Sequence, residues 1–205
     1  MTIFLFILAY VIGSIPTALI VGKVFFNIDI REHGSNNPGA TNTLRVLGKK
    51  AAIIVLFVDV GKGALAASLP LLFHMEMNPL HLGLMAVIGH CFPVFAGFRG
   101  GKAIATTAGA LLVANIGLFL ITYITFILVI LITKYVFFGS ISVGIVLLLY
   151  SIMESGAEND ILFIIFLLLL IFLHRTNIRH FINHQEPKIN DKNLANDRIK
   201  TKKIQ

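Results

Sequence analysis

Residues 104–133 read IATTAGALLVANIGLFLITYITFILVILIT, about thirty residues in a row without a charged side chain. A helix crosses the hydrocarbon core of a bilayer with about 20 residues, within a range of about 17 to 25. This run is therefore too long for one span. Asn115 and Gly117 lie near its middle, and we expect the chain to break there into two helices, the first of them short.

The whole chain, like this run, is rich in apolar residues and poor in charged ones. Of 205 residues, 57% are hydrophobic and only 13% are charged, whereas a soluble domain carries about 25% charged residues. A soluble fold is therefore excluded. The single cysteine, Cys91, rules out an internal disulfide and any multi-cysteine metal site. We predict one all-α integral membrane domain over residues 1–183, followed by a flexible polar cytoplasmic tail over residues 184–205.

Five further apolar segments bring the predicted number of transmembrane helices to seven. They are Thr2–Val21, Ala51–Phe73, Leu80–Phe95, Gly139–Met153 and Ile161–Leu173. The second of these contains Asp59 and Lys62, three residues apart. Charges within the membrane are costly unless they are paired, so we expect a structural ion pair here in preference to a proton or ion path.

The distribution of charge predicts the orientation. With seven spans and the N-terminus outside, 16 of the 17 Lys and Arg residues fall in segments on the inner side, and Lys62 is the exception. The charged residues of the outer loops are all acidic: Glu76, Glu154, Glu158 and Asp160. Positive charge marks cytoplasmic loops, so we predict a cytoplasmic C-terminus. The net charge of +7 then reports orientation and gives no support to nucleic-acid binding.

The first inner segment with unusual residues is Gly34–Asn42, GSNNPGATN, which is followed by Leu44 and Arg45. We expect a short helix near Ala40–Gly48. Glycines let successive backbone N–H groups converge, and a helix N-terminus adds partial positive charge. Thr41 and Arg45, four residues apart, would project from one face of the helix. The segment is a candidate anion cradle, and the alternative is an ordinary turn with a helix cap.

The second inner segment is Phe98–Lys102, FRGGK, which runs into an apolar segment. A Gly-Gly turn and a lysine at the start of a membrane helix resemble half of a phosphate loop. The spacing of a Walker motif, G-x-x-x-x-G-K-[ST], is missing, which argues against a nucleoside triphosphate site. The alternative is a basic anchor at the membrane surface, and this suits Arg99 better than Lys102.

The third inner segment is His174–Asn177, HRTN, at the cytoplasmic end of the last span. His174 and Asn177 are three residues apart and share a helix face. The alternative for His174 is a cap or interface residue. Ser140 lies on the same inner side, where its ordinary role would be a helix N-cap. Two anion-binding turns on one membrane face indicate one phosphorylated substrate or two.

In this order, the motifs resemble the bacterial acyl-phosphate:glycerol-3-phosphate acyltransferase family of the PlsY type. The resemblance covers nearly the whole chain, to about Ile189. The matching stretches are Gly13–Pro16, Gly22-Lys23, Asp29–Ser35, Asn37–Asn42, Leu44-Arg45, Gly89-His90, Pro93, Phe95, Gly100–Lys102, His174-Arg175, Asn177 and Glu186–Ile189.

The resemblance implies a seven-helix enzyme of the bacterial cytoplasmic membrane, with its active site facing the cytoplasm and no cofactor or metal. It would transfer a fatty acyl group from acyl-phosphate to the 1-hydroxyl of glycerol 3-phosphate, the first acylation step of phospholipid biosynthesis. The products would be 1-acylglycerol 3-phosphate (lysophosphatidate) and inorganic phosphate. The oligomeric state is left open.

The resemblance also implies roles for individual residues. The glycerol 3-phosphate ligands would be Ser35, Arg45, Lys102, Ser140, His174 and Asn177. The pocket for the acyl-phosphate headgroup would be lined by Gly39, Ala40, Thr41, Gly100 and Gly101. Candidate catalytic residues are Ser35, Lys102 and His174. The chain departs from the family pattern at Asn36 and Ala103, where glycine is usual, and at Thr176, where glutamate is common.

The chemistry agrees with this resemblance. An acyl phosphate is already activated, so the protein needs mainly to position two anions and to neutralise charge on the phosphate. The H-x-x-x-x-D pair of the other large glycerolipid acyltransferase class is missing from the sequence. The hydroxyl proton could go to His174 or, in the substrate-assisted route that we favour, to an acyl-phosphate oxygen.

Two other classes of function compete with the enzyme. A transporter for an anionic metabolite would also aim helix N-termini at its substrate, but the anion motifs cluster at one membrane face and the two halves show no repeat. A small membrane scaffold would leave both candidate cradles unexplained.

Overall fold

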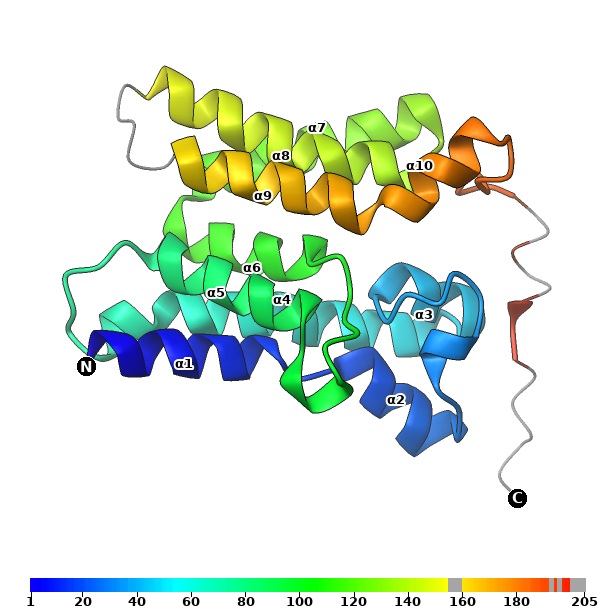
Figure 1. Cartoon of the computed structure of the whole chain (residues 1–205), viewed down its shortest axis with the longest axis horizontal. Coiled ribbons are helices and arrows are strands. Elements are labelled where there is room, and N and C mark those ends of the chain that lie inside the picture. Colours follow the sequence, from blue (N-terminus) through cyan, green and yellow to red (C-terminus); the bar gives the residue numbers. More distant parts are fainter. Residues whose placement is uncertain (155–159, 192–193, 195–196, 200–205) are drawn as a thin grey trace. The chain divides into compact units, whose positions relative to one another are not determined.

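The structure is a computed structural model that describes residues 1–154, 160–191, 194 and 197–199. Within these residues it contains ten α-helices, two short 3-10 helices and no strand (Figure 1). The all-α prediction is therefore confirmed for the described part of the chain. The helices form two compact units, one of residues 1–114 with the end of the tail and one of residues 115–191. Each unit is described by itself.

Unit 1 contains six α-helices and both 3-10 helices. In chain order they are α1 (Thr2–Gly13), α2 (Thr17–Phe26), η1 (Ile30–Glu32), α3 (Ala40–Val46), α4 (Lys49–Leu72), α5 (Pro79–Cys91), η2 (Val94–Ala96) and α6 (Ile104–Ala114). The long helix α4 packs against α1, α2, α3, α5 and α6, and α1 packs along α5. Small apolar side chains fill these contacts, including Ala9, Ala66 and Ala86, all fully buried.

Unit 2 is a row of helices in which each packs against the next. They are α7 (Ile116–Thr133), α8 (Val136–Met153), α9 (Asp160–Leu173) and α10 (Arg175–Ile182). α8 contacts both α7 and α9, and α10 continues from α9 after a bend of 53° at His174. The predicted outer-loop residue Glu158 lies outside the described residues.

The predicted break near Asn115 is confirmed. α6 ends at Ala114 after eleven residues, and the Asn115 side chain accepts a hydrogen bond of 2.9 Å from the backbone N–H of Leu118. This bond satisfies one of the N–H groups that the first turn of a helix leaves unpaired. Asn115 therefore both ends the apolar run and starts α7.

The first apolar segment differs from the prediction, because it consists of two helices where one was expected. α1 ends at Gly13 with Ser14 as its C-cap, and α2 begins at Thr17, directly after Pro16. Proline has no N–H to donate and disfavours a helical conformation at the residue before it. α2 then continues to Phe26, beyond the predicted end at Val21.

Five helical stretches are long and apolar enough to cross a membrane, and the bent pair α9–α10 makes a sixth if it is counted as one span. The first five are Thr2–Phe26, Lys49–Leu72, Pro79–Ala96, Ile116–Thr133 and Val136–Met153. α6 is apolar but shorter. Each of the seven predicted segments therefore contains a helix, while length and composition support five or six spans.

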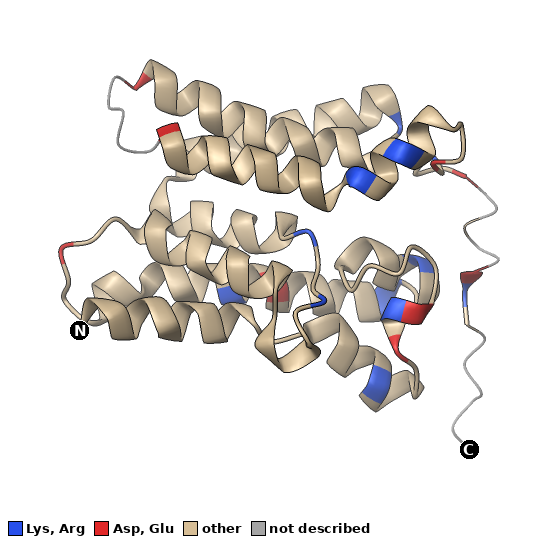
Figure 2. Ribbon diagram, in the orientation of Figure 1, with Lys and Arg blue, Asp and Glu red and all other residues tan. Residues whose placement is uncertain are grey.

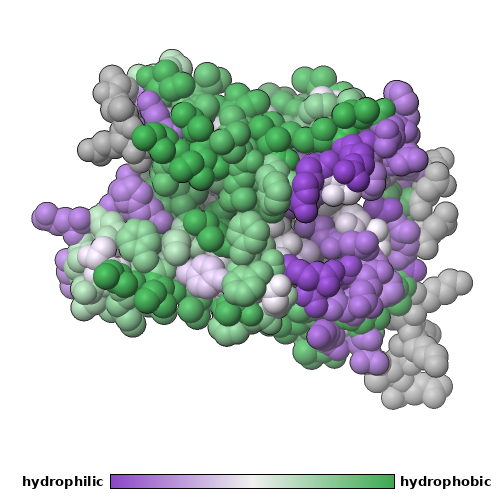
Figure 3. Space-filling model, viewed as in Figure 1, coloured by the Kyte–Doolittle hydropathy of each residue, from purple (hydrophilic) through white to green (hydrophobic). Residues whose placement is uncertain are grey.

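Charge and hydropathy separate along the helices of each unit. Figure 2 shows that Lys and Arg in unit 1 gather around α2, α3 and the loop before α6, with one blue position inside α4. In unit 2 the basic residues lie around α10, while acidic residues lie at the opposite ends of the helices and also beside α10. Figure 3 shows green apolar side chains over the helices and purple polar ones at their ends. Both units therefore have the charge distribution of a membrane protein.

Candidate functional site

The first glycine-containing loop is held in shape by Asn42, a residue of α3 that is 1% exposed. Its side-chain oxygen accepts the backbone N–H of Ser35 at 2.9 Å, and its amide nitrogen donates to the carbonyl of His33, also at 2.9 Å. Asn36 takes the left-handed conformation with φ of 57°. Asn42 thus fixes the turn that carries Ser35.

The predicted helix after this loop is confirmed as α3, Ala40–Val46. Gly39 is its N-cap and has no side chain to cap the first turn. Arg45 lies in the last turn, and its Nε forms an ion pair with Asp197 of the tail. The backbone N–H of Ile199 also donates to the carbonyl of Val46 at 3.0 Å. The described tail residues therefore contact the helix that carries Arg45.

The second glycine-containing loop docks on the C-terminal end of α5. The N–H groups of Gly100 and Gly101 donate to the carbonyls of Cys91 and His90, both at 3.1 Å. These bonds satisfy carbonyls that a helix end leaves unpaired, and they occupy both glycine amides. Because the two glycines have no side chains, they can still line a pocket in this conformation. Their N–H groups are not available to bind an anion, so the positive charge that an anion needs has to come from neighbouring side chains.

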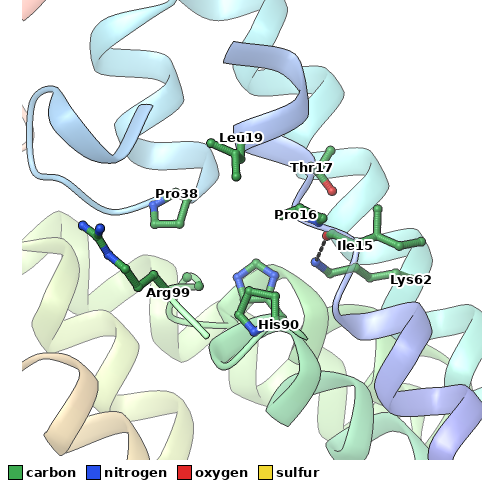
Figure 4. Close-up of a pocket in the computed structure, with 11 residues that line it drawn as sticks. Ile15, Pro16, Thr17, Leu19, Pro38, Lys62, His90 and Arg99 are labelled. Carbon is green, nitrogen blue, oxygen red and sulfur yellow. Dashed lines mark hydrogen bonds between the residues drawn. The ribbon is translucent and has the colours of Figure 1, made fainter. Parts of the chain in front are cut away.

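The two loops face a common small cleft in unit 1. Its lining residues are Ile15, Pro16, Thr17, Leu19, Pro38, Lys62, His90, Pro93, Arg99, Gly100 and Gly101. In Figure 4, Pro38 and Arg99 lie on one side, and the His90 ring lies beneath the Pro16 segment that joins α1 to α2. The cleft thus combines apolar walls with basic side chains, and two of the predicted acyl-phosphate residues, Gly100 and Gly101, line it.

Arg31 connects the segment before the first glycine-containing loop to the segment before the second. The Arg31 guanidinium donates to both carboxylate oxygens of Asp29 and, through Nη1, to the carbonyl of Ala96 at 2.9 Å. The hydrogen bond from Arg31 holds the pKa of Asp29 at about 2, below its ordinary value of 3.8. Asp29 therefore stays ionised at neutral pH, and Arg31 links η1 to η2 beside the cleft.

The predicted ion pair within α4 is confirmed. Lys62 Nζ lies 2.9 Å from Asp59 Oδ1, and the two residues are 5% and 2% exposed. The hydroxyl of Thr17 donates to the same carboxylate at 3.0 Å, and Lys62 donates to the carbonyl of Ile15 at 3.1 Å (Figure 4). The pair therefore ties α4 to the break between α1 and α2.

The N-cap role considered for Ser140 is wrong. α8 begins at Val136, before the predicted start at Gly139, and the Ser140 hydroxyl donates to the Val136 carbonyl one turn earlier at 3.1 Å. Glycine suggested a helix boundary at Gly139, but a Cβ there would press on Ile130 and on the Phe126 carbonyl of α7. This glycine allows close packing of α7 and α8. Ser140 is 2% exposed.

His174 lies where α9 bends into α10, at the N-cap position of α10. It is 2% exposed, and its Nδ1 is 2.9 Å from the carbonyl of Leu170. A carbonyl only accepts, so Nδ1 carries a hydrogen and donates to it. One turn on, the Asn177 side-chain amide donates to Glu186 at 2.6 Å. Unit 2 therefore brings His174 and Asn177 to the same bend.

Comparison with known proteins decides the family. A model of the family described as glycerol-3-phosphate acyltransferase matches residues 3–184. Glycerol-3-phosphate acyltransferase 2 of Bacillus cereus is 49% identical over 193 residues, which cover 92% of this chain and 96% of that protein. The glycerol-3-phosphate acyltransferase of Bacillus subtilis is 46% identical over 185 residues, 90% of this chain and 96% of that protein. This chain belongs to the glycerol-3-phosphate acyltransferase family.

Solved structures agree with this assignment. The crystal structure of PlsY (YgiH), an integral membrane glycerol 3-phosphate acyltransferase, in its glycerol 3-phosphate form matches with a TM-score of 0.83 and 33% identity. The match covers 91% of this chain and 94% of that one. The lysophosphatidic acid form matches with a TM-score of 0.80 and 32% identity. The chain is therefore an integral membrane acyltransferase of phospholipid biosynthesis.

Some residues that build the cleft of this acyltransferase received no functional role from the sequence. His90 and Pro16 belong to the motifs of the resemblance, and Arg99 was considered only as a membrane anchor. The sequence signal that could have found them is a histidine and a proline inside apolar segments, both unusual there. Among the described residues, no group of three or more His, Cys, Asp or Glu could hold a metal ion.

Proposed function

We propose that this glycerol-3-phosphate acyltransferase uses acyl-phosphate as its donor. The fatty acyl group passes to the 1-hydroxyl of glycerol 3-phosphate, and the products are 1-acylglycerol 3-phosphate and inorganic phosphate. The bond that forms joins the glycerol oxygen to the acyl carbonyl carbon, and the bond that breaks joins this carbon to the phosphate oxygen.

The cleft of unit 1 is the observation that carries the proposal. Ile15 and Leu19 give it apolar walls, while the exposed Arg99 brings positive charge to it. An acyl phosphate has the matching chemistry, an apolar chain attached to a small anion. A thioester donor would bring a neutral reacting group, which has less need of cations.

The residues that hold the substrates follow the family motifs. Glycerol 3-phosphate is held by the residues that the motifs assign to it, which are Ser35, Arg45, Lys102, Ser140, His174 and Asn177. Gly39, Ala40, Thr41, Gly100 and Gly101 make room for the acyl-phosphate headgroup. Lys102 neutralises the charge that grows on the leaving phosphate, because a fixed cation in a partly dry site stabilises such charge more strongly than water does.

The hydroxyl proton has two possible acceptors, and we favour an oxygen of the acyl-phosphate itself. His174 binds its own helix carbonyl through Nδ1, which orients the ring, and in this proposal it positions glycerol 3-phosphate. The scheme needs no cofactor or metal, because the donor is already activated and the leaving group is already stable as an anion.

We propose seven transmembrane spans, with the N-terminus outside and the C-terminus in the cytoplasm of a bacterial inner membrane. The short helix α6 counts as the fourth span, and α9 as the seventh. The support is the charge distribution of each unit, in which Lys and Arg gather at one end of the helices (Figure 2). The donor cleft then opens to the cytoplasmic side, where glycerol 3-phosphate and acyl-phosphate are supplied.

The donor is tested with the purified full chain in liposomes, supplied with labelled glycerol 3-phosphate and either palmitoyl phosphate or palmitoyl-CoA. We expect lysophosphatidate and one equivalent of inorganic phosphate from palmitoyl phosphate, with the acyl group on the 1-position. Product from palmitoyl-CoA at an equal or higher rate would overturn the choice of donor. Uptake of glycerol 3-phosphate without product would favour transport.

Lys102→Ala tests the role given to the lysine. We expect kcat to fall at least about 100-fold, which corresponds to about 2.7 kcal/mol of lost transition-state stabilisation. Lys50→Ala is the matched control, since it removes an exposed lysine at the start of α4 that does not line the cleft. Near-wild-type kcat for Lys102→Ala would reduce the lysine to an anchor at the membrane surface.

A further inference from the structure

The C-terminal part of α5, which carries the cleft residue His90, packs closely against α1. A Cβ on Gly13 of α1 would overlap backbone atoms of Ala86, and a Cβ on Gly89 would overlap the Tyr10 carbonyl. The two helices therefore touch backbone to backbone here. The Tyr10 hydroxyl also donates to the carbonyl of Phe92, just after α5, at 2.8 Å. The end of α5 that carries His90 therefore has little freedom to move.

The His90 ring lies between a buried charge and the second glycine-containing loop. Its Nδ1 is 3.7 Å from Asp59 Oδ1, and His90 is 7% exposed. On the other side, a Cβ added to Gly101 would overlap Nε2 of the ring and press on Cε1 and Cδ2. The ring therefore fills the space beside Gly101, while the His90 carbonyl accepts the N–H of the same glycine at 3.1 Å.

The Asp59–Lys62 pair fixes the other side of the ring. Ion pairs buried in a membrane protein are costly unless further hydrogen bonds satisfy them, and here Thr17 and the Ile15 carbonyl complete the set. The hydrogen bond from Thr17 and the contact with Lys62 therefore help to hold the carboxylate that faces His90 Nδ1. The ion pair thus contributes to the position of the His90 ring.

We propose that His90 is a positioning residue for the acyl transfer reaction. Its carbonyl and its ring together place Gly101, and through the chain direction of Gly101 they place the adjacent Lys102 at the donor phosphate. This inference rests on the proposed function, in which Lys102 neutralises the leaving phosphate. Asp59 acts one step further away, by holding the ring that faces Gly101.

A double-mutant cycle between His90 and Gly101 tests the contact itself. Gly101→Ala adds the Cβ that overlaps the ring, and its φ lies outside the left-handed region, so the backbone tolerates alanine. We expect His90→Ala and Gly101→Ala each to lower kcat/KM for palmitoyl phosphate about tenfold or more, because small displacements of a reacting group are costly. The double variant should lose less than the product of the two, because the missing ring leaves room for the new methyl group.

The pattern of kinetic constants separates positioning from general loss of structure. We expect His90→Ala to lower kcat and to raise KM for both substrates, because the displaced Lys102 belongs to the proposed glycerol 3-phosphate ligands and also faces the donor phosphate, whereas a partly unfolded enzyme would lose kcat with KM unchanged. His90→Gln keeps a polar side chain that can face Asp59 and should recover most of the activity. His81→Ala, at the other end of α5, is the matched control and should match the wild type.

A readout without catalysis distinguishes failure of this inference from failure of the proposed function. Hydrogen–deuterium exchange at residues 100–102 should be slow in the wild type, because both glycine amides are hydrogen-bonded, and faster in His90→Ala. Strictly additive effects in the cycle, or unchanged exchange in His90→Ala, would overturn the positioning role. If exchange is faster in His90→Ala but the wild type makes no product from palmitoyl phosphate, the contact between His90 and Gly101 is supported and acyl-phosphate is not the donor.

Discussion

At the scale of single residues, Ala103 adopts a backbone conformation that alanine rarely takes. Its φ is 59°, and the residue is 2% exposed at the point where the second glycine-containing loop enters α6. An L-residue pays about 1 to 2 kcal/mol for the left-handed conformation. The family resemblance places glycine at this position, and the geometry supplies the physical reason for that preference.

Ala103→Gly should therefore lower the free energy of unfolding less than an alanine-to-glycine change at a neighbouring helical position does. The matched variant is Ala105→Gly, in the first turn of α6, where the backbone is helical. Both changes loosen the unfolded chain equally, so the two variants should differ by about 1 to 2 kcal/mol in favour of Ala103→Gly. Thermal unfolding in detergent measures the difference. Equal melting temperatures would show that Ala103 stores no strain.

At the scale of elements, α4 and α6 pack so closely that glycine is required on both. A Cβ on Gly63 would overlap the Thr106 carbonyl, and a Cβ on Gly109 would overlap the Val60 carbonyl. Small residues allow helix backbones to approach each other in this way in membranes. The contact positions α6, whose N-terminal end carries the loop with Lys102.

Gly109→Val should force α4 and α6 apart and abolish both folding and activity. The side chain would meet backbone atoms, which have no room to move, and overpacking of this kind costs at least about 1 to 3 kcal/mol. Gly61→Val is the matched control, because a Cβ there meets nothing within 4 Å. Monodispersity and melting temperature of the detergent-purified variants measure the effect. A stable, active Gly109→Val protein would contradict the close packing of the two helices.

The elements also show where sequence patterns were sufficient. The break at Asn115 and the pair Asp59–Lys62 were predicted, because a polar side chain in an apolar run has few local ways to be satisfied. Ser140 was misplaced, because Gly139 suggested a helix boundary although its real reason is packing against α7. The contact between His90 and Gly101 depends on the docking of the loop on α5, and helical periodicity carries no information about it.

At the scale of the whole molecule, the chain outside the family match contacts a residue inside it. The family model ends at residue 184, yet the Asp197 carboxylate pairs with Arg45, and Ile199 binds the backbone of Val46. Sequence composition predicted only a polar tail here, because a single acidic residue without a periodic pattern does not specify a partner. The tail carboxylate occupies a guanidinium that the proposed function assigns to glycerol 3-phosphate.

Asp197→Asn should consequently lower KM for glycerol 3-phosphate. A partly exposed ion pair contributes up to about 1 kcal/mol, so we expect a decrease of about two- to fivefold, with kcat unchanged. The difference from the wild type should shrink at high salt, because ions screen exposed charges. Asp191→Asn is the matched control, since it makes the same change of net charge in the same tail. If both variants keep the wild-type KM at low salt, the tail carboxylate does not compete with the phosphate for Arg45, and its contact with α3 serves packing alone.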